Sequence, residues 1–153
     1  MKNQALNFAT YHWSDLSTDL LYDLMRIRQE VFIVEQECPY LDADGKDQKG
    51  YHVTMEFQNQ LVGYTRLLPL IVSYPDYTSI GRVVIGKSAR GKGWGYPLMQ
   101  YSIDQCKALW PNDKIKISAQ AHLKGYYEQC GFEWTGEEYL EDDIPHIGMI
   151  ESK

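Results

Sequence analysis

The feature that most constrains this chain is a strand, turn, helix, strand pattern between Ile80 and Ala119. Ile80 to Ile85 is a short run rich in β-branched residues, and the turn Arg90 to Gly95 has glycine at alternate positions. Apolar residues then recur at helical spacing from Met99 to Trp110, and Ile115 to Ala119 is a second β-branched run. This order predicts a βαβ unit with two parallel strands and a right-handed crossover.

The rest of the chain predicts a mixed α/β fold, because an antiparallel hairpin precedes the βαβ unit. Leu20, Leu24, Ile27 and Val31 form the apolar stripe of a helix that should end near Glu35. Five strands and one more helix complete the prediction. The strands are Leu6–Trp13, Tyr51–Phe57, Leu61–Leu70, Phe132–Thr135 and His146–Ile150, and the helix is Leu123–Gln129.

Composition narrows the class of protein. No linker divides the 153 residues, so we expect a single domain over residues 1–153. The net charge of −6 argues against nucleic acid as the main partner, since phosphate binding needs a basic surface. No apolar run is long enough to span a membrane, and the N-terminus has no secretory signal, so we expect a cytoplasmic protein.

The potential metal ligands do not form a recognisable site. Cys38, Cys106 and Cys130 are odd in number and widely spaced, unlike a disulfide framework or a zinc site. Asp42-Ala43-Asp44-Gly45 begins like a calcium loop, but its glycine comes too early, and Val53 stands where the loop needs glutamate. We therefore expect no metal.

Two segments match phosphate-binding patterns. Gly81 to Ser88 satisfies G-x-x-x-x-G-K-[ST], the loop of nucleotide triphosphatases. Its middle residues favour a strand, and no helix begins at Ser88, so we reject that interpretation. Arg90 to Gly95 instead lies directly between a strand and a helix. The amides of such a turn and of the helix N-terminus attract a pyrophosphate, and Lys87, Arg90 or Lys92 would add a further contact.

Charge is spread unevenly along the chain. Lys87, Arg90 and Lys92 lie together without an acid, whereas Glu137 to Asp143 contains five acids and no base. A second acidic segment runs from Glu35 to Asp47. The acidic segments either attract a cationic ligand or are solvated surface.

Several segments of the sequence resemble those of a known family. Arg90 to Gly95 matches the R/Q-x-x-G-x-G/A signature of the GCN5-related N-acetyltransferases (GNAT), and Tyr127 to Phe132 matches their later Y-E-x-x-G-F segment. Further segments are similar to the ElaA-like branch of that superfamily. They are Arg28–Gln36, Cys38–Gly45, Ile80–Val83, Ala119–Leu123 and Ile144–Met149. The resemblance implies a mostly antiparallel mixed sheet with a splayed parallel strand pair and about four helices.

The resemblance also implies the cosubstrate acetyl-CoA and the residues that bind it. Backbone groups of Val83, Val84 and Ile85 would hold its pantetheine arm, and Gln120 would supply an amide contact. The turn and the first helical residue would hold the pyrophosphate. These residues are Arg90, Gly91, Lys92, Gly93, Trp94, Gly95 and Tyr96.

Catalytic roles follow from the same resemblance. Tyr127 occupies the position of the general acid, and a backbone N–H near Ile85 would stabilise the oxyanion. The base is left open: we favour His122, while Glu30, Glu35, His52, Glu56 and water remain alternatives. Cys130 has no identifiable partner for nucleophilic catalysis, so we expect direct transfer.

The sequence thus predicts an acetyl-CoA-dependent N-acetyltransferase that acts on the primary amine of a small molecule or peptide. A non-catalytic acyl-CoA-binding module is the alternative. We expect no nucleic acid or membrane partner, and either a monomer or a homodimer.

Overall fold

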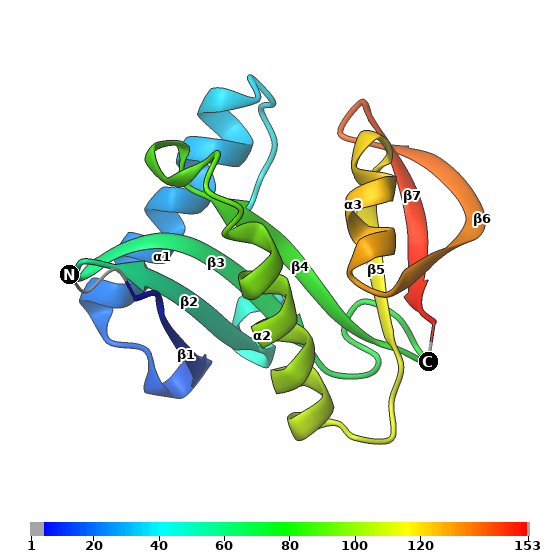
Figure 1. The fold of residues 1–153 in the computed structure, drawn as a ribbon, viewed down its shortest axis with the longest axis horizontal. Helices are drawn as coiled ribbons and strands as arrows, with labels where there is room; N and C mark the ends of the chain where they lie inside the picture. The colour runs from blue at the N-terminus through cyan, green and yellow to red at the C-terminus, as the bar shows by residue number, and fades with distance from the viewer. Residues whose placement is uncertain (1–4, 153) are drawn as a thin grey trace.

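The computed structural model describes residues 5–152, which form one seven-stranded sheet in the order β1-β2-β3-β4-β5-β7-β6 (Figure 1). Residues 1–4, on which the expectation of no secretory signal partly rests, lie outside the described part. The strands are β1 Asn7–His12, β2 Tyr51–Phe57, β3 Gln60–Leu68, β4 Thr78–Ile85, β5 Ile115–Gln120, β6 Phe132–Glu141 and β7 Ile144–Glu151.

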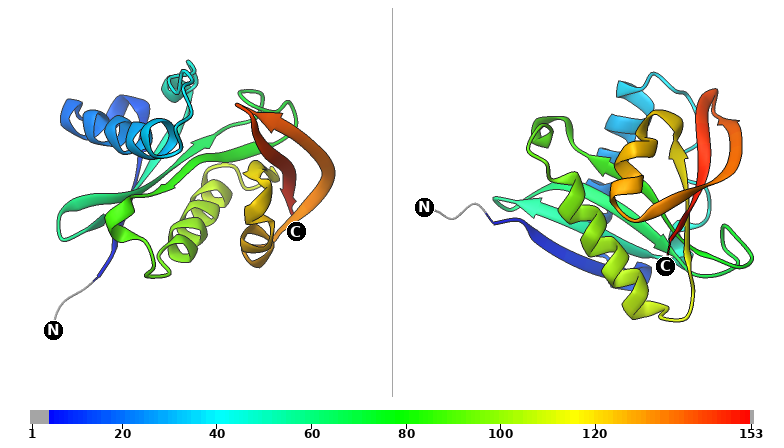
Figure 2. Two further views of the ribbon diagram at one scale, coloured as in Figure 1. Left: turned by 90° about the horizontal axis from the view of Figure 1, so that it is seen from above. Right: turned by 45° about the vertical axis from the view of Figure 1, so that its right-hand side comes forward.

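In the described part of the chain three α-helices accompany the sheet, and a π-helical turn, Gln29–Glu35, continues the first of them. They are α1 Thr18–Arg28, α2 Gly95–Leu109 and α3 Lys124–Gln129. The helix α1 covers one face of the sheet, and α2 and α3 cover the other (Figure 2). In residues 5–152, no helix combines the length and the apolar character that a membrane crossing requires.

The mixed fold class is confirmed. Within residues 5–152, β4 and β5 are the one parallel pair of strands, and they pair at two positions, Thr78 with Ile115 and Ser79 with Lys116. All other neighbouring strands are antiparallel. Beyond Ser79 the parallel strands diverge, as Figure 1 shows. The βαβ unit therefore contains an opening between its own two strands.

The predicted end of β6 is wrong. The strand does not stop at Thr135 but continues to Glu141, and it pairs with β7 on both sides of an irregularity between Trp134 and Glu138. Glycine and repeated acids are rare in strands, so the local sequence indicated a loop. The acidic run from Glu137 to Asp143 is instead the outer part of a β-hairpin and its turn.

Two apolar clusters hold the helices to the sheet. Leu24, Ile27 and Val31 of α1 and its π-helical continuation pack on Tyr64 and Val84. The larger cluster lies on the opposite face and joins α2 and α3 to every strand of the sheet. Its fully buried members include Val53, Met55, Leu67, Leu98, Met99, Ile115 and Met149. The central strands are thus covered on both sides, as their apolar sequences predict.

A buried network of charges fastens the segment before β2 to the sheet. Arg28, at the end of α1, is fully buried. Its Nε donates to Asp42 Oδ2 at 2.8 Å, and its Nη1 donates to Asp47 Oδ1 at 2.8 Å. Arg66 of β3 also donates to Asp47 Oδ1, at 2.8 Å. Because a buried charge is costly unless it is paired, these contacts hold the segment in place.

The arginines also control the ionisation of Asp47. Burial acts to raise the pKa of this carboxyl group, but the hydrogen bonds and charges of Arg28 and Arg66 outweigh it. The pKa of Asp47 is therefore held below its ordinary value. The carboxylate form is the one that the folded protein stabilises.

Asp47→Asn should destabilise the protein. It leaves the guanidinium groups of Arg28 and Arg66 without a shared counter-charge inside the protein, which costs about 3 kcal/mol of unfolding free energy. Urea denaturation of both proteins measures this loss. Asp76→Asn is the matched control, because Asp76 is exposed and forms no ion pair within residues 5–152. Equal stabilities for the Asp47 variant and the wild type would contradict the network's structural role.

The stability gap between wild type and Asp47→Asn should also depend on pH. The folded state lowers the pKa of Asp47, so its contribution is complete above the unfolded value of about 3.9 and is lost as pH falls through the folded value. We expect the gap to be constant near neutrality and to narrow in acid. Urea denaturation along a pH series measures it, and a gap that widens in acid would have the wrong sign.

Candidate active site

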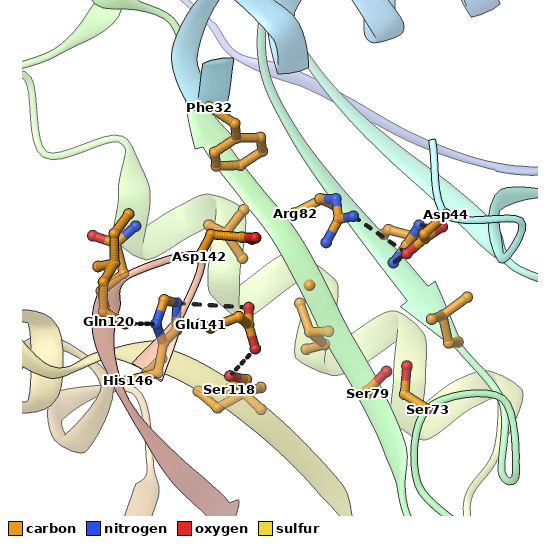
Figure 3. Close-up of a pocket in the computed structure, with 18 of the residues that line it drawn as sticks. Phe32, Asp44, Ser73, Ser79, Arg82, Ser118, Gln120, Glu141, Asp142 and His146 are labelled. Carbon is orange, nitrogen blue, oxygen red and sulfur yellow. Dashed lines mark hydrogen bonds and ion pairs between the residues drawn. The ribbon is translucent and has the colours of Figure 1, made fainter. Parts of the chain in front are cut away.

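A cleft of about 340 Å³ lies where β4 and β5 diverge (Figure 3). The two strands form its floor, and the β6–β7 hairpin forms one wall. The opposite wall comes from the segment before β2 and the loop after β3. Tyr127 of α3 also lines the cleft. Among its lining residues are Asp44, Arg82, Ser118, Gln120, Tyr127, Glu141, Asp142 and His146.

A bulge in β4 shapes this floor. The pairing of β3 with β4 shifts between Tyr64 and Arg66, and Arg82 opposite the shift has a φ of 51°. A side chain at positive φ is strained, so its surroundings must hold it there. Arg82 Nε donates to Asp42 Oδ1 at 2.7 Å, and its Nη2 donates to Asp44 Oδ2 at 3.2 Å. The bulge and the opposite wall of the cleft are thus fastened to each other.

Tyr127 of α3 is one of the residues that line the cleft. The residue Tyr127 is 7% exposed. Its ring packs edge-on against the rings of Tyr126 and Phe132, with centroid distances of 4.9 and 6.3 Å. Burial, with a smaller effect from Cys130, raises the pKa of Tyr127 to about 12. The Tyr127 hydroxyl forms no hydrogen bond with another group of residues 5–152. The group is therefore protonated at neutral pH and free to donate.

The glycine-rich turn lies at the start of α2 and has the form of an anion cradle. Gly91 and Gly93 have φ values of 79° and 75°, and a Cβ at either position would meet no protein atom within 4 Å. Across residues 5–152, the backbone N–H groups of 91–94 have no acceptor. The first helical N–H groups of α2 have none within the helix either. Open space lined by free donors fits a pyrophosphate.

The basic side chains near this turn are partly engaged with the protein. Arg90 forms an ion pair with Glu35 and donates through Nε to the Ile85 carbonyl at 3.0 Å. Lys92 lies over the Trp94 ring, 5.6 Å from its centroid. The Arg90 guanidinium therefore bridges the turn to the π-helical segment, and the backbone amides are the donors left free.

The remaining residues predicted to contact the cofactor lie on β4, β5 and α2. Val83 and Val84 face opposite apolar clusters, so their side chains are structural. Ile85 ends β4 opposite Gly63. Gln120 ends β5 and points into the cleft (Figure 3). Tyr96 donates to Gln129 Oε1 at 2.5 Å, which links α2 to α3.

The rejected triphosphatase motif has no phosphate-loop geometry. Its first five residues, Gly81–Ile85, belong to β4, and Lys87 begins a short 3-10 turn rather than a helix. The structure agrees with the rejection based on sequence.

The structure separates the bases suggested by sequence from the cleft. His122 is exposed on a short turn and is not part of the lining. His52 is fully buried. Its Nδ1 is hydrogen-bonded to the Tyr64 hydroxyl at 2.5 Å, and its Nε2 donates a hydrogen bond to the Asp47 carbonyl at 2.9 Å. Glu30 pairs with Arg26 outside the cleft.

The other two candidate carboxylates are also placed elsewhere. Glu35 is engaged with Arg90, which holds the pKa of this carboxyl group below its ordinary value. Glu56 lies on β2 and does not line the cleft. None of the five named candidates is therefore in the cleft wall formed by residues 5–152.

Sequence reasoning missed the polar side chains of the β6–β7 hairpin. Glu141 and His146 line the cleft, and Ser118 of β5 lies beside them (Figure 3). His146 pairs with Gln120 in the β5–β7 register, which places both on the same face of the sheet. A longer prediction for β6, followed by alternation of side chains, would have found this cluster.

The acidic segment from Glu35 to Asp47 differs from the acidic hairpin. Asp42, Asp44 and Asp47 are paired with arginines, so their charge is neutralised within the protein. The same pairing accounts for the calcium-like sequence at Asp42–Gly45. Within residues 5–152, no three His, Cys, Asp or Glu side chains gather as the ligands of a metal ion.

Comparison with known proteins defines the class. The domain described as "Acetyltransferase (GNAT) domain" matches residues 24–152, so the chain belongs to the GNAT acetyltransferase family. The protein ElaA of Escherichia coli is 41% identical over 140 residues, which cover 90% of this chain and 91% of ElaA. The resemblance to the ElaA-like branch is thus confirmed.

Solved structures agree in fold. An acyl-CoA N-acyltransferase from Pseudomonas aeruginosa superposes with a TM-score of 0.90 at 42% identity, over 97% of this chain and 100% of that one. The crystal structure of E. coli ElaA gives a TM-score of 0.88 at 38% identity, over 95% of this chain and 99% of that one. The splayed mixed sheet is therefore the GNAT fold.

Proposed function

We propose that this protein transfers an acetyl group from acetyl-CoA directly to a primary amine. The observation that carries the proposal is the position of Tyr127, which lines the cleft between the diverging strands and whose hydroxyl has no hydrogen-bond partner within residues 5–152. Family membership and the free amides of the glycine-rich turn support the same conclusion.

The chain offers two kinds of binding surface to acetyl-CoA, which supplies the activated acetyl group. The backbone amides from Gly91 to Tyr96 would hold its pyrophosphate, because fixed N–H groups bind anions without a change in conformation. The backbone of Val83 to Ile85, where β4 no longer pairs with β5, would hold the pantetheine arm. The reacting carbonyl would then lie in the cleft.

Two groups of the chain then act on the reaction. A backbone N–H at the end of β4, near Ile85, would stabilise the negative charge that develops on the carbonyl oxygen. Tyr127 would donate its proton to the departing sulfur. A phenol with a pKa of about 12 is protonated at neutral pH, so it is available as a general acid.

Tyr127→Phe should separate an enzyme from a protein that only binds acyl-CoA. The ring packing is retained and only the hydroxyl is lost, so we expect unchanged acetyl-CoA affinity with turnover reduced on the order of 100-fold. Calorimetric titration measures the affinity, and thiol release across a set of primary amines measures turnover. Tyr22→Phe, at an exposed position on α1, is the control.

Wild-type protein that binds acetyl-CoA and releases no thiol with any amine would instead support the non-catalytic module. A parallel titration with hexanoyl-CoA tests the acetyl specificity. If hexanoyl-CoA binds and reacts better, the acyl group in the proposal is wrong while the transfer reaction stands.

Gly93→Ala should weaken acetyl-CoA binding. The new Cβ has room, but alanine at a φ of 75° costs about 1 kcal/mol, so the turn relaxes away from the geometry that aims its amides. We expect an affinity loss of about fivefold by calorimetry. Gly136→Ala introduces the same kind of strain at a φ of 95° in β6 and should leave the affinity unchanged. Equal effects of the two variants would contradict the assignment of the turn.

A further inference from the structure

The hairpin wall of the cleft carries a connected set of polar side chains. The Tyr139 hydroxyl donates to Ser118 Oγ at 2.6 Å, and Ser118 Oγ donates to Glu141 Oε1 at 3.3 Å. The second oxygen, Glu141 Oε2, lies 3.7 Å from His146 Nε2. Figure 3 shows Glu141 and His146 pointing toward each other above Ser118. The set therefore ends in a carboxylate oxygen and an imidazole nitrogen that face each other.

The protonation of His146 follows from its other nitrogen. His146 Nδ1 is 2.7 Å from the Ile144 carbonyl, which can only accept a hydrogen bond. Nδ1 therefore carries the proton, and in the neutral ring Nε2 carries a lone pair. His146 is only 8% exposed, and the Tyr139 ring stacks on it with centroids 6.2 Å apart. The orientation of Nε2 is thus fixed by packing.

The two facing atoms do not satisfy each other. Both Glu141 Oε2 and neutral His146 Nε2 are acceptors, and 3.7 Å is too long for a direct hydrogen bond. A group with two or three N–H donors bonds to both atoms at once. A primary ammonium has such donors and a charge that complements the carboxylate.

The charges around the pair favour a cation at this position. The other charged residues that line the cleft are Asp44, Lys46, Arg66, Arg82, Lys116 and Asp142. Asp44 is paired with Arg66 and Arg82, and Lys116 is paired with Glu137 at 3.0 Å. Of the lining carboxylates, Glu141 and Asp142 are the two with no lysine or arginine partner within residues 5–152.

We propose that Glu141 and His146 form the acceptor site, in which Glu141 holds the primary ammonium of the acceptor and His146 Nε2 removes its proton. The inference rests on the proposed acyl transfer and adds the site of the amine to it. Deprotonation converts the ammonium to a neutral amine, whose lone pair attacks the thioester carbon. The carboxylate then stabilises the imidazolium that forms.

The protons balance over the whole reaction. A C–N bond forms and the C–S bond breaks, and the departing sulfur takes a proton from Tyr127. The nitrogen loses two protons in becoming an amide. The first passes through His146 to solvent, and the second replaces the proton that Tyr127 gave to sulfur. No oxidant, reductant or further reactant is needed.

His146→Gln tests the role of the imidazole. Glutamine retains polarity and similar reach but cannot act as a base, so kcat/KM for the amine should fall on the order of 100-fold. The pH profile should also lose the limb that reports the imidazole, while acetyl-CoA affinity stays unchanged. His12→Gln, on β1 and away from the cleft, is the matched control. A full loss in His122→Gln with none in His146→Gln would overturn the assignment.

Glu141→Gln tests the role of the carboxylate. The variant retains the hydrogen bond from Ser118 but loses the charge, so KM for the amine should rise about tenfold with a smaller change in kcat. An unchanged KM would contradict the binding role of Glu141. Glu138→Gln, on the same hairpin but outside the cleft lining, is the control.

Binding of an amine without turnover separates this inference from the proposed function. In ¹⁵N spectra of the histidine rings, His146 should show its proton on Nδ1, and n-butylammonium chloride should shift its Nε2 signal. The shift should be absent in Glu141→Gln. A proton on Nε2 in the neutral ring, or no shift with the ammonium, would overturn the acceptor site even if thiol release is observed. Conversely, a shift without thiol release would refute the transfer reaction alone.

Discussion

The structure depends on how early the parallel strands β4 and β5 stop pairing. Two pairs of residues join them, and beyond Ser79 each strand leaves the other. Backbone groups that a continuous sheet would satisfy then face an open cleft. Sites at the carboxyl ends of parallel strands are common because the connections diverge there. Here the strands diverge as well, so the cleft reaches into the sheet itself and brings the buried Tyr127 within reach of a ligand.

Charge pairing holds this opening in shape. The bulge at Arg82 requires a backbone conformation that an arginine rarely adopts, and Asp42 and Asp44 hold the side chain that lies there. Arg28 and Arg66 complete the connection to the helix and to the neighbouring strand. A buried charge is costly without a partner, so ion pairs with these arginines hold the segment before β2 in position.

The cleft joins two chemically different sides. On the side of α2 and α3, free amides and a protonated phenol suit an anionic thioester substrate and its departing sulfur. On the hairpin side, a carboxylate and an imidazole suit an amine. The amides at the start of α2 and the polar groups of the hairpin lie on different elements, so neither binding surface has to accommodate the charge of the other. The sequence left two alternatives for the acidic hairpin, a solvated surface or a surface that attracts a cation, and the proposed reaction uses the second.

The sequence by itself determined the parts of this protein that depend on local pattern. The βαβ unit, the α1 stripe and the β2–β3 hairpin follow from the spacing of apolar residues, and the glycine-rich turn follows from residues that tolerate positive φ. The family resemblance rested on short segments that include this turn, Tyr127–Phe132 and Ile144–Met149. Only the tertiary structure decided that β6 extends to Glu141, that Asp42 and Asp44 are neutralised by arginines, and that His146 rather than His122 faces the cleft. These outcomes depend on strand pairing and ion pairs between residues distant in the chain, whose energies no local pattern records.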